Sequence, residues 1–432
     1  MCFQNGLRQL ILAGKMGVNK SEALSLFTWP GIVRILCFGN LMTVFYYKSW
    51  GSQPLNVFIV MGSLLICVLA IGFGYSYLFP GVQPIAENFE ILKPPDNLTT
   101  ECNYFEGKWE YDENYPLYNA SECPFVERGF SCLANGRKDK EYLKWRWKPN
   151  DCDIPNFNVS VVLEKLRGKR IVFVGDSLSR NQWESMICLL MTGVEDKNSV
   201  YEVNGHKITR RIRYLSVRFK SFNFTIEFYR SVYLVQPGSK PKSAPKRVKF
   251  TRQLDKLDDI NTEWINSDIL IFGTGHWWTP GKLFYTGRYF QVGGKLKLGI
   301  SMNAAYKMAL ATWASWAEEM VKRNRTQVFF RTFESAHWSG PTQRSCKVTK
   351  QPLSEITGIE QSPFSKIAMK LVKNTTIPVT VMDVTPMTAF RSDAHVGTWS
   401  ESPSVHDCSH WCLPGVPDMW NEMLFSYILS QR

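Results

Sequence analysis

The chain has 432 residues, of which 44% are hydrophobic and 21% are charged, and its formal net charge is +13. An ordinary apolar content combined with a modest charged fraction excludes a mainly disordered chain. Only one long stretch is both uncharged and apolar, which excludes a multi-pass membrane protein. The basic balance leaves three kinds of partner, namely nucleic acid, an anionic membrane, or an acidic or hydroxyl-rich polymer.

One apolar segment predicts a transmembrane helix. Val57–Phe79 is 23 residues long, which is enough to cross a bilayer. Residues 1–55 carry five Lys+Arg against one Glu, whereas the first charges after the segment are mostly acidic. The positive-inside rule therefore places the N-terminus in the cytosol and the C-terminal part across the membrane. A cleaved signal peptide is the alternative, but the apolar run starts late and is long for one.

Sequons and cysteines agree with a secretory-pathway domain beyond this segment. Eight cysteines lie there, an even number that suggests four disulfides, with zinc binding as the weaker alternative. A domain in that compartment does not meet nucleic acid, which removes this explanation of the charge. Six glycosylation sequons lie on the same side: Asn97, Asn119, Asn158, Asn223, Asn324 and Asn374.

The chain divides into five predicted parts. These are a cytosolic segment 1–55, a transmembrane signal anchor 56–79, a Pro-rich stem 80–100, a Cys-rich module 101–156 and a main domain 157–432. The stretch Ile35–Tyr47 is also apolar and is interpreted as cytosolic or interfacial.

Strands and helices alternate in the main domain, which predicts an α/β fold with a parallel sheet. Predicted strands are Lys169–Val174, Ile269–Phe272, Val328–Phe330 and Val379–Met382, and predicted helices are Ser177–Met191, Ala304–Arg323, Ile356–Val372 and Pro417–Ile428. Between Tyr201 and Leu234 the pattern has period two, which suggests an inserted β-hairpin or meander.

The first predicted strand is followed by Gly175-Asp176-Ser177, directly before a helix. This order places the Ser177 hydroxyl at the carboxyl edge of the sheet, where α/β sites lie, next to the free N–H groups of a helix start. Such a position suits a nucleophile whose reaction develops an oxyanion. The alternative is that Ser177 only caps the helix.

A second motif, Asp407-Cys408-Ser409-His410, comes in a predicted loop before the last helix. A neutral His takes the proton of a serine, and a carboxylate fixes the tautomer of that His. Residues three apart on one turn reach the same site. The alternative is a surface loop held by Cys408 and Cys412.

Together the two motifs resemble the SGNH/GDSL hydrolase superfamily. The longer string GDSLSRNQWES, the GHWW string at Gly275–Trp278 and the upstream cysteine module sharpen this resemblance to the plant trichome birefringence-like family of polysaccharide O-acetyltransferases. The similarity covers about residues 101–432. It implies a three-layer α/β/α SGNH-like acyltransferase domain with a smaller disulfide-stapled lobe, the two lobes lining a polymer groove.

The resemblance also implies a two-step acetyl transfer. Ser177 would be the nucleophile, His410 the base and Asp407 its orienting acid, with Asp176 structural. The acetyl donor would be a co-substrate, acetyl-CoA being one candidate, with no bound cofactor or metal ion. The implied disulfides are Cys102–Cys152, Cys123–Cys188, Cys132–Cys412 and Cys346–Cys408.

SGNH enzymes use an Asn in a later sequence block as an oxyanion donor. The matching stretch here, Ile271–His276, contains no Asn. We therefore expect the Ser177 backbone N–H, with Arg180 or Asn181, to support the transition state. Asn181 as a helix-surface or capping residue is the alternative.

Further side chains are candidates for substrate binding. His276, His395 and His337 are expected to line the groove, and Trp277 and Trp278 to stack on sugar rings, as Trp145 and Trp147 would also do; packed core roles remain the alternatives.

Most of the excess positive charge lies in one part of the sequence. Residues 197–256 carry 15 Lys+Arg against three acids, so this insertion holds most of the excess. Its Arg211 and Arg213 are expected to face an acidic polymer such as pectin or glucuronic-acid-bearing xylan, with a solvated loop as the alternative, especially for Lys240–Lys249.

The leading prediction is a type II Golgi membrane O-acetyltransferase with a lumenal catalytic domain and a cell-wall polysaccharide acceptor (xylan or another hemicellulose, or pectin). Its partners would be this acceptor, the membrane and Golgi proteins that supply acetyl groups. The rivals are a polysaccharide acetylesterase with the same triad and a non-catalytic cell-wall polymer-binding protein.

Overall fold

The computed structural model describes residues 35–38, 41–44, 102–321, 325–339, 345–356, 362–402 and 404–430. The chain forms two units, Met1–Leu98 and Thr99–Arg432. In the first unit, β1 (Ile35–Phe38) and β2 (Leu41–Val44) pair antiparallel. The predicted signal anchor 56–79 and stem 80–100 lie outside the described residues. Within the described ranges, no helix is both long and apolar enough to cross a bilayer.

A seven-stranded sheet forms the centre of the second unit, in the order β17-β14-β11-β5-β8-β7-β6. The first five strands of this order are parallel, and β7 and β6 run antiparallel to their neighbours. The parallel strands are β5 (Arg170–Gly175), β8 (Phe224–Arg230), β11 (Ile269–Gly273), β14 (Gln327–Arg331) and β17 (Val379–Met382). The antiparallel strands are β6 (Val200–Glu202) and β7 (Tyr214–Phe219).

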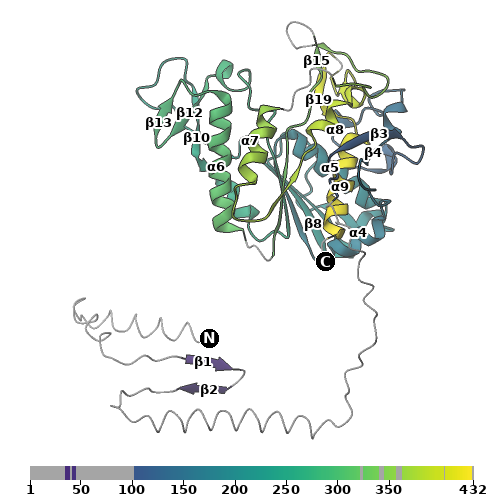
Figure 1. Cartoon of the computed structure of the whole chain (residues 1–432), viewed down its shortest axis with the longest axis horizontal. Helices are drawn as coiled ribbons and strands as arrows, with labels where there is room; N and C mark the ends of the chain where they lie inside the picture. The colour runs from purple at the N-terminus through teal and green to yellow at the C-terminus, as the bar shows by residue number, and fades with distance from the viewer. Residues whose placement is uncertain are drawn as a thin grey trace, which may run out of the picture. The chain divides into compact units, whose positions relative to one another are not determined.

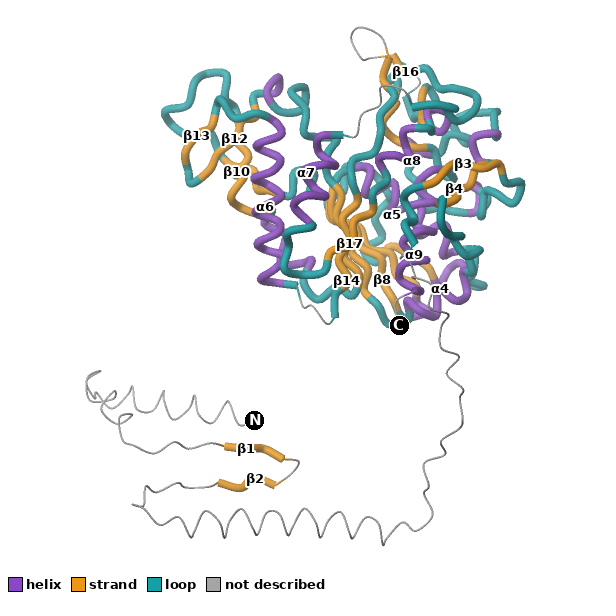
Figure 2. Tube along the Cα trace, in the orientation of Figure 1, coloured by secondary structure: helices purple, strands orange, loops and turns teal. Residues whose placement is uncertain are grey.

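Helices cover both faces of this sheet (Figure 1, Figure 2). Alternate residues of β5 point to opposite faces, so Phe173 packs in one apolar cluster and Val172 in another. The first cluster is shared with α4 (Val159–Leu166), α5 (Ser177–Met191) and α9 (Val416–Ser430). The second is shared with α6 (Met302–Met320) and α7 (Pro363–Val372). The result is a layered α/β domain, as predicted.

The segment 201–234 forms the predicted antiparallel meander, β6-β7-β8, but within the central sheet. It is not an insertion, because β8 pairs in parallel with β5 and brings β7 and β6 into the central sheet. A period-two pattern indicates strands with one face more deeply buried than the other. Strands near the edge of a sheet and strands of a separate hairpin both show this pattern.

The second unit also contains a second, four-stranded sheet, in the order β13-β12-β10-β9. Figure 1 shows β10, β12 and β13 beside α6. Its strands are β9 (Val235–Gly238), β10 (Phe250–Leu257), β12 (Arg288–Val292) and β13 (Lys295–Lys297). Sequence periodicity did not predict this sheet.

The Cys-rich module packs directly on the main domain. Its hairpin consists of β3 (Gly107–Tyr111) and β4 (Trp145–Pro149), and its Phe130 and Trp147 belong to the same apolar cluster as α5 and α9. Trp147 is therefore a core residue. Short 3-10 helices complete the module: Ala120–Glu122, Arg128–Phe130 and Glu141–Leu143.

The remaining elements are short. They are α8 (Thr385–Ala389), β15 (Trp338–Ser339), β16 (Ser345–Cys346), β18 (His395–Gly397), β19 (Asp407–Trp411) and the 3-10 helices Lys197–Ser199, Lys220–Phe222, Asp259–Trp264, Phe284–Thr286 and Ser392–Ala394. The Asp407–His410 motif thus lies on strand β19, paired with β18, and not in a loop.

Candidate active site

The junction of β5 and α5 places Ser177 at the carboxyl edge of the central sheet. A Cβ atom on Gly175 would come within 2.0 Å of the Gly273 carbonyl oxygen, so the close approach of β5 and β11 requires glycine. Asp176 caps α5, because its Oδ1 accepts from the Leu178 N–H at 2.9 Å. Ser177 is the first helical residue and not the cap, so its hydroxyl is free for another partner.

That partner is His410. Ser177 Oγ lies 2.6 Å from His410 Nε2, and His410 Nδ1 lies 2.7 Å from Asp407 Oδ2. The two motifs, which are 230 residues apart in sequence, therefore form one hydrogen-bonded row of serine, imidazole and carboxylate. The side chains of His410 and Asp407 are 22% and 27% exposed, which leaves the row within reach of a substrate.

The surroundings of Asp407 favour its ionised form. Burial alone would raise the pKa of Asp407, but His410 and the backbone N–H groups of Ser409 and His410 lower that pKa below its ordinary value. Asp407 Oδ1 accepts both N–H groups, at 2.9 and 3.0 Å. A carboxylate at this place accepts the Nδ1 proton of His410, which leaves Nε2 free to accept from Ser177.

Two disulfides fix strand β19 beside the nucleophile. Cys408 is bonded to Cys346 of β16, and Cys412, directly after the strand, is bonded to Cys132 of the module. The imidazole also packs against the module, because the Phe130 ring stacks on His410 with centroids 5.3 Å apart. The module thus supports the site as well as covering the helices.

Two family models match the chain. Residues 154–427 match the GDSL/SGNH-like acyl-esterase family found in Pmr5 and Cas1p, and residues 100–153 match the PMR5 N-terminal domain. Trichome birefringence-like 7 of Arabidopsis thaliana is 59% identical over 88% of this chain and 86% of its own length. Trichome birefringence-like 6 of the same plant is 40% identical over 79% of this chain and 73% of its own length.

The chain belongs to the trichome birefringence-like family. Its main domain is accordingly an acyl-esterase domain of the SGNH type, and the chemistry of that domain is acyl transfer or ester hydrolysis. The resemblance seen in the sequence is confirmed by both matches.

The four disulfides implied by the family resemblance are all present. Cys102–Cys152 closes the module, Cys123–Cys188 joins it to α5, and the other two hold β19. Among the sequons, the asparagines at four positions are exposed: Asn119, Asn158, Asn223 and Asn374. Asn97 and Asn324 lie outside the described residues.

Arg180 is held by ion pairs within the protein. Its guanidinium forms ion pairs with Glu127 of the module and with Glu184 one turn along α5. It also lies over the Phe130 ring, 4.8 Å from its centroid, on a ring that itself stacks on His410. Arg180 therefore contacts His410 through the Phe130 ring, and its contact with the transition state stays a prediction.

The side chain of Asn181 connects helix α5 to strand β19. Its Nδ2 donates to the Trp411 carbonyl oxygen at 3.2 Å, and its Oδ1 accepts from the Trp411 N–H at 3.3 Å. Asn181 is fully buried, so the expected oxyanion role is corrected to that of a clamp between α5 and β19.

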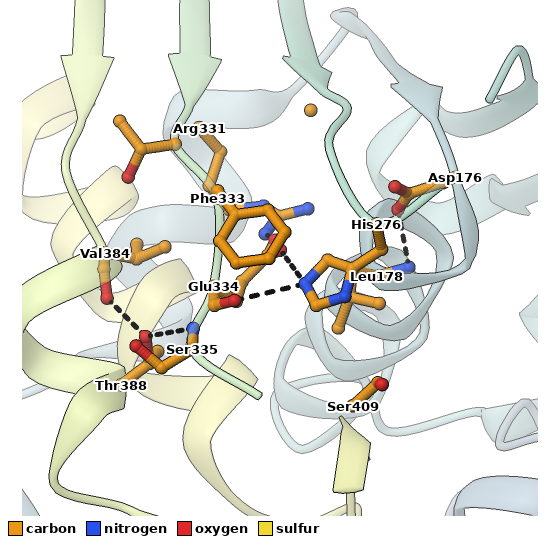
Figure 3. Close-up of polar contacts among 12 residues, drawn as sticks. Asp176, Leu178, His276, Arg331, Phe333, Glu334, Ser335, Val384, Thr388 and Ser409 are labelled. Atoms are coloured by element: carbon orange, nitrogen blue, oxygen red, sulfur yellow. Dashed lines mark hydrogen bonds and ion pairs between the residues drawn. The ribbon is translucent and has the colours of Figure 1, made fainter. Parts of the chain in front are cut away.

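His276 belongs to a buried polar network near the nucleophile (Figure 3). Its Nε2 lies 3.0 Å from Glu334 Oε2, and its ring stacks on Phe333 at 4.3 Å. Burial lowers the pKa of His276 to about 4, so the ring is neutral at pH 7. Arg331 pairs with the same glutamate and donates to Ser179 Oγ at 3.3 Å.

Sequence reasoning missed Arg331 and Glu334. Both are buried, and both follow the pattern of a buried strand that ends in polar residues at the carboxyl edge. That position was the available signal, because side chains after neighbouring parallel strands converge at one edge.

The two tryptophans of the GHWW string differ. Trp278 is 1% exposed in the core beside α6 and donates to Thr274 Oγ1 at 3.2 Å, so its expected sugar contact is corrected. Trp277 is partly exposed, with Arg230 and Lys282 over its ring at 5.2 and 5.0 Å.

His395 is fully buried, which corrects its expected place in a groove. Its Nδ1 lies 3.0 Å from the His410 carbonyl oxygen, and its Nε2 lies 2.7 Å from His337 Nδ1. His395 therefore contacts the backbone of His410, and His337 contacts His395.

Arg211 is exposed, and Arg213 forms ion pairs with Asp258 and Asp259, each at 2.6 Å. Arg213 is thus largely neutralised within the protein. Among the described residues, no cluster of three or more His, Cys, Asp or Glu side chains is arranged to hold a metal ion.

Proposed function

We propose that the chain is an O-acetyltransferase that moves an acetyl group to a hydroxyl of a plant cell-wall polysaccharide. The observation that carries the proposal is the contact of 2.6 Å between Ser177 Oγ and His410 Nε2, completed by Asp407. Membership in a family with an acyl-esterase domain supports the acyl chemistry.

In the first step, Ser177 Oγ attacks the carbonyl carbon of an acetyl donor while His410 Nε2 takes the hydroxyl proton. The oxyanion forms next to the start of α5, where the Ser177 backbone N–H and the helix dipole stabilise it. Collapse of the tetrahedral intermediate breaks the bond to the donor, and His410 returns the proton to the leaving group. The product is acetyl-Ser177.

In the second step, a sugar hydroxyl takes the place of the leaving group. His410 removes its proton, the sugar oxygen attacks the acetyl carbonyl, and a second oxyanion forms at the same donor. Its collapse releases the O-acetylated sugar and returns the proton to Ser177. Asp407 stays ionised throughout and stabilises the imidazolium that forms in each step.

The donor is proposed to be a diffusible co-substrate, such as acetyl-CoA, delivered with the help of Golgi acetyl-supply proteins. We also propose that residues 56–79 anchor the chain as a type II Golgi membrane protein. The charge difference across this segment and the exposed sequons support that topology. Protease protection of the C-terminal part in sealed microsomes, together with glycosidase-sensitive mass shifts, tests it.

The activity is tested with the full-length protein in detergent. It is incubated with a labelled acetyl donor and with oligomers of xylan, xyloglucan, mannan and pectin, and the products are identified by mass spectrometry. We expect acetylated oligomers, and a loss of at least about 10³-fold for Ser177→Ala. Full activity of Ser177→Ala would exclude Ser177 as the nucleophile, whereas binding of the oligomers without any acetyl transfer by the unmodified protein would favour a non-catalytic polymer-binding protein.

Ester hydrolysis is the second candidate, since the matched family is described as an acyl-esterase family. Water and a sugar hydroxyl attack acetyl-Ser177 by the same route. The ratio of acetyl-oligosaccharide to free acetate formed from the labelled intermediate distinguishes the two activities, and free acetate alone, at saturating oligosaccharide, identifies an esterase.

A further inference from the structure

Tyr233, which follows strand β8, lies beneath Arg252, and the charges of Arg230 and Arg288 also act on it. Tyr233 is only 2% exposed, and its Oη has no hydrogen-bond partner within the described part of the chain. The Arg252 guanidinium lies over its ring at 4.6 Å. Burial raises the pKa of Tyr233 to about 12, while the positive charges of Arg252, Arg288 and Arg230 act in the opposite direction. A buried donor without a partner is costly unless a ligand supplies one.

This arrangement lies at the same edge of the sheet as the nucleophile. Gly175 of β5 pairs with Arg230 of β8 on one side and with Gly273 of β11 on the other. Ser177 follows Gly175 by two residues, and Trp277 follows Gly273 by four. The ring of Trp277 lies 6.1 Å from that of Tyr233 and beneath Arg230. Arg230 and Trp277 therefore lie at the sheet edge that carries Ser177, and Tyr233 lies next to them.

Arg252 and Arg288 come from the second sheet. The register pairs Arg252 of β10 with Phe290 of β12, and Arg288 is two residues before Phe290. Because side chains alternate along a strand, Arg252 and Arg288 lie on the same face of this sheet. Arg288 lies over the Phe250 ring at 5.5 Å and donates to Thr286 Oγ1 at 2.6 Å, on the face of the sheet that also carries Arg252.

Among the residues that the structure describes, no carboxylate forms an ion pair with Arg230, Arg252 or Arg288. Asp258, whose negative charge acts on Arg252, is bound to Arg213 and to Ser231, and Asp255 accepts from the Gly293 N–H. Asp176 caps α5. Burial and the neighbouring positive charges lower the pKa of Arg230 and of Arg252. Among described residues, the arginine–carboxylate pairs involve other arginines: Arg137, Arg167, Arg170, Arg180, Arg213, Arg325, Arg331 and Arg391.

We propose that Arg230, Arg252 and Arg288 form a carboxylate-binding subsite around the Tyr233 hydroxyl, and that it takes the uronic acid group of an acidic polysaccharide acceptor. The proposal rests on the proposed transfer to a polysaccharide and specifies the class of acceptor. A guanidinium binds a carboxylate through two parallel hydrogen bonds, and the Tyr233 hydroxyl donates a further one.

The positive surface continues beyond the subsite, which favours a polymer over a small anion. The loop between β9 and β10 belongs to the same second sheet as Arg252 and Arg288, and its basic residues are exposed: Lys240, Lys242, Lys246, Arg247 and Lys249. A chain of sugars that carries repeated carboxylates matches this extension, whereas a single donor phosphate matches only the subsite.

Binding is measured first, with the full-length Ser177→Ala protein so that no turnover occurs. The ligands are an oligogalacturonide and a glucuronic-acid-branched xylo-oligosaccharide, each paired with a neutral form, the methyl ester and the unbranched oligomer. We expect at least one acidic ligand to bind about 10-fold more tightly than its neutral form in calorimetry at low salt.

Arg252→Gln and Arg288→Gln, alone and together, then test the subsite. Each is expected to weaken the acidic ligand about 10-fold and to leave the neutral form within about twofold. Arg325→Gln is the matched control, because Arg325 is exposed and precedes β14 at the opposite end of the sheet. It should bind like the parent. Melting temperatures confirm that each variant is folded.

Three results would overturn the subsite. They are equal binding of acidic and neutral ligands by the parent, unchanged acidic binding by the folded double variant, or loss of acetyl-CoA binding in that variant while acidic oligomers still bind. The last result would assign the arginines to a donor phosphate. Because binding is independent of turnover, these outcomes are distinct from a failure of acetyl transfer in the unmodified protein.

Discussion

His395 Nδ1 lies 3.0 Å from the backbone carbonyl oxygen of His410, so one buried imidazole supports the strand that carries another. A carbonyl oxygen only accepts, which places a proton on His395 Nδ1. The His395 ring also stacks on Trp411 with centroids 4.0 Å apart. Strand β19 is thus held on both sides of the catalytic histidine, and the geometry of Ser177 and His410 depends on it.

Replacing His395 with alanine removes this donor and leaves a cavity beside Trp411. We expect kcat to fall about 10- to 100-fold with little change in KM, because a small displacement of His410 affects chemistry more than binding. His395→Asn retains an N–H near the position of Nδ1 and should recover most of kcat. Steady-state kinetics on folded protein checks both variants. Equal impairment of the two would argue against the hydrogen bond.

Asp407→Asn separates the charge of Asp407 from its structural contacts. An asparagine Oδ1 can still accept the N–H groups of Ser409 and His410, so β19 should keep its conformation. The amide cannot stabilise the imidazolium, and it favours the wrong tautomer of His410. We expect kcat to fall about 10⁴-fold with an unchanged melting temperature. A loss below tenfold would mean that Asp407 is not the orienting acid.

The parts of the fold predicted from sequence are those with local signals. The apolar run of β5 and the helical spacing after Ser177 predicted that unit to within a residue. The second sheet and the membership of β8 in the central sheet depend on pairing between distant segments, such as Gly175 with Arg230. A period-two pattern shows that a strand has two faces, but not which strand it pairs with.

The site shows the same division. Ser177, His410 and Asp407 were found because two short motifs together resemble a family. Trp278 was misassigned, because a tryptophan in a motif can be buried or exposed, and only tertiary packing decides. For Arg180, a signal was present: Glu184 lies four residues later on the same helix, a spacing at which opposite charges pair.

Arg180→Gln tests the supporting role of that arginine. Glu184 is fully buried, and burial raises its pKa, whereas the positive charge of Arg180 lowers that pKa and favours the ionised form in the ion pair. Removing the partner should destabilise the fold by about 3–5 kcal/mol. Because Arg180 contacts His410 through the Phe130 ring, we expect kcat of the folded fraction to fall less than about tenfold.

Thermal unfolding and active-site titration of Arg180→Gln give the two quantities separately. The double variant Arg180→Gln/Glu184→Gln removes the unpaired acid and should regain part of the stability. A loss of about 10²- to 10³-fold in kcat with normal stability is typical of an oxyanion donor. That result would confirm the transition-state role that the sequence predicted for Arg180.

The contact between Tyr115 and Glu422 links the module to α9, and it makes the stability of that link sensitive to pH. Tyr115 donates to Glu422 Oε2 at 2.7 Å, and Glu422 is 2% exposed. Burial raises the pKa of Glu422 from 4.5 to about 8. The folded state therefore retains a proton that the unfolded state releases above pH 4.5, and the stability that Glu422 contributes declines as pH rises toward 8.

Glu422→Gln is neutral at every pH and keeps the shape of the protonated acid. Its melting temperature should therefore fall less steeply than that of the parent between pH 5 and 8, with a remaining slope from Asp418, whose pKa burial raises to about 7. Glu319→Gln, at an exposed position on α6, is the matched control and should follow the parent. Equal slopes for Glu422→Gln and the parent would show that Glu422 is ionised in the folded protein at pH 7, with its charge stabilised by its surroundings.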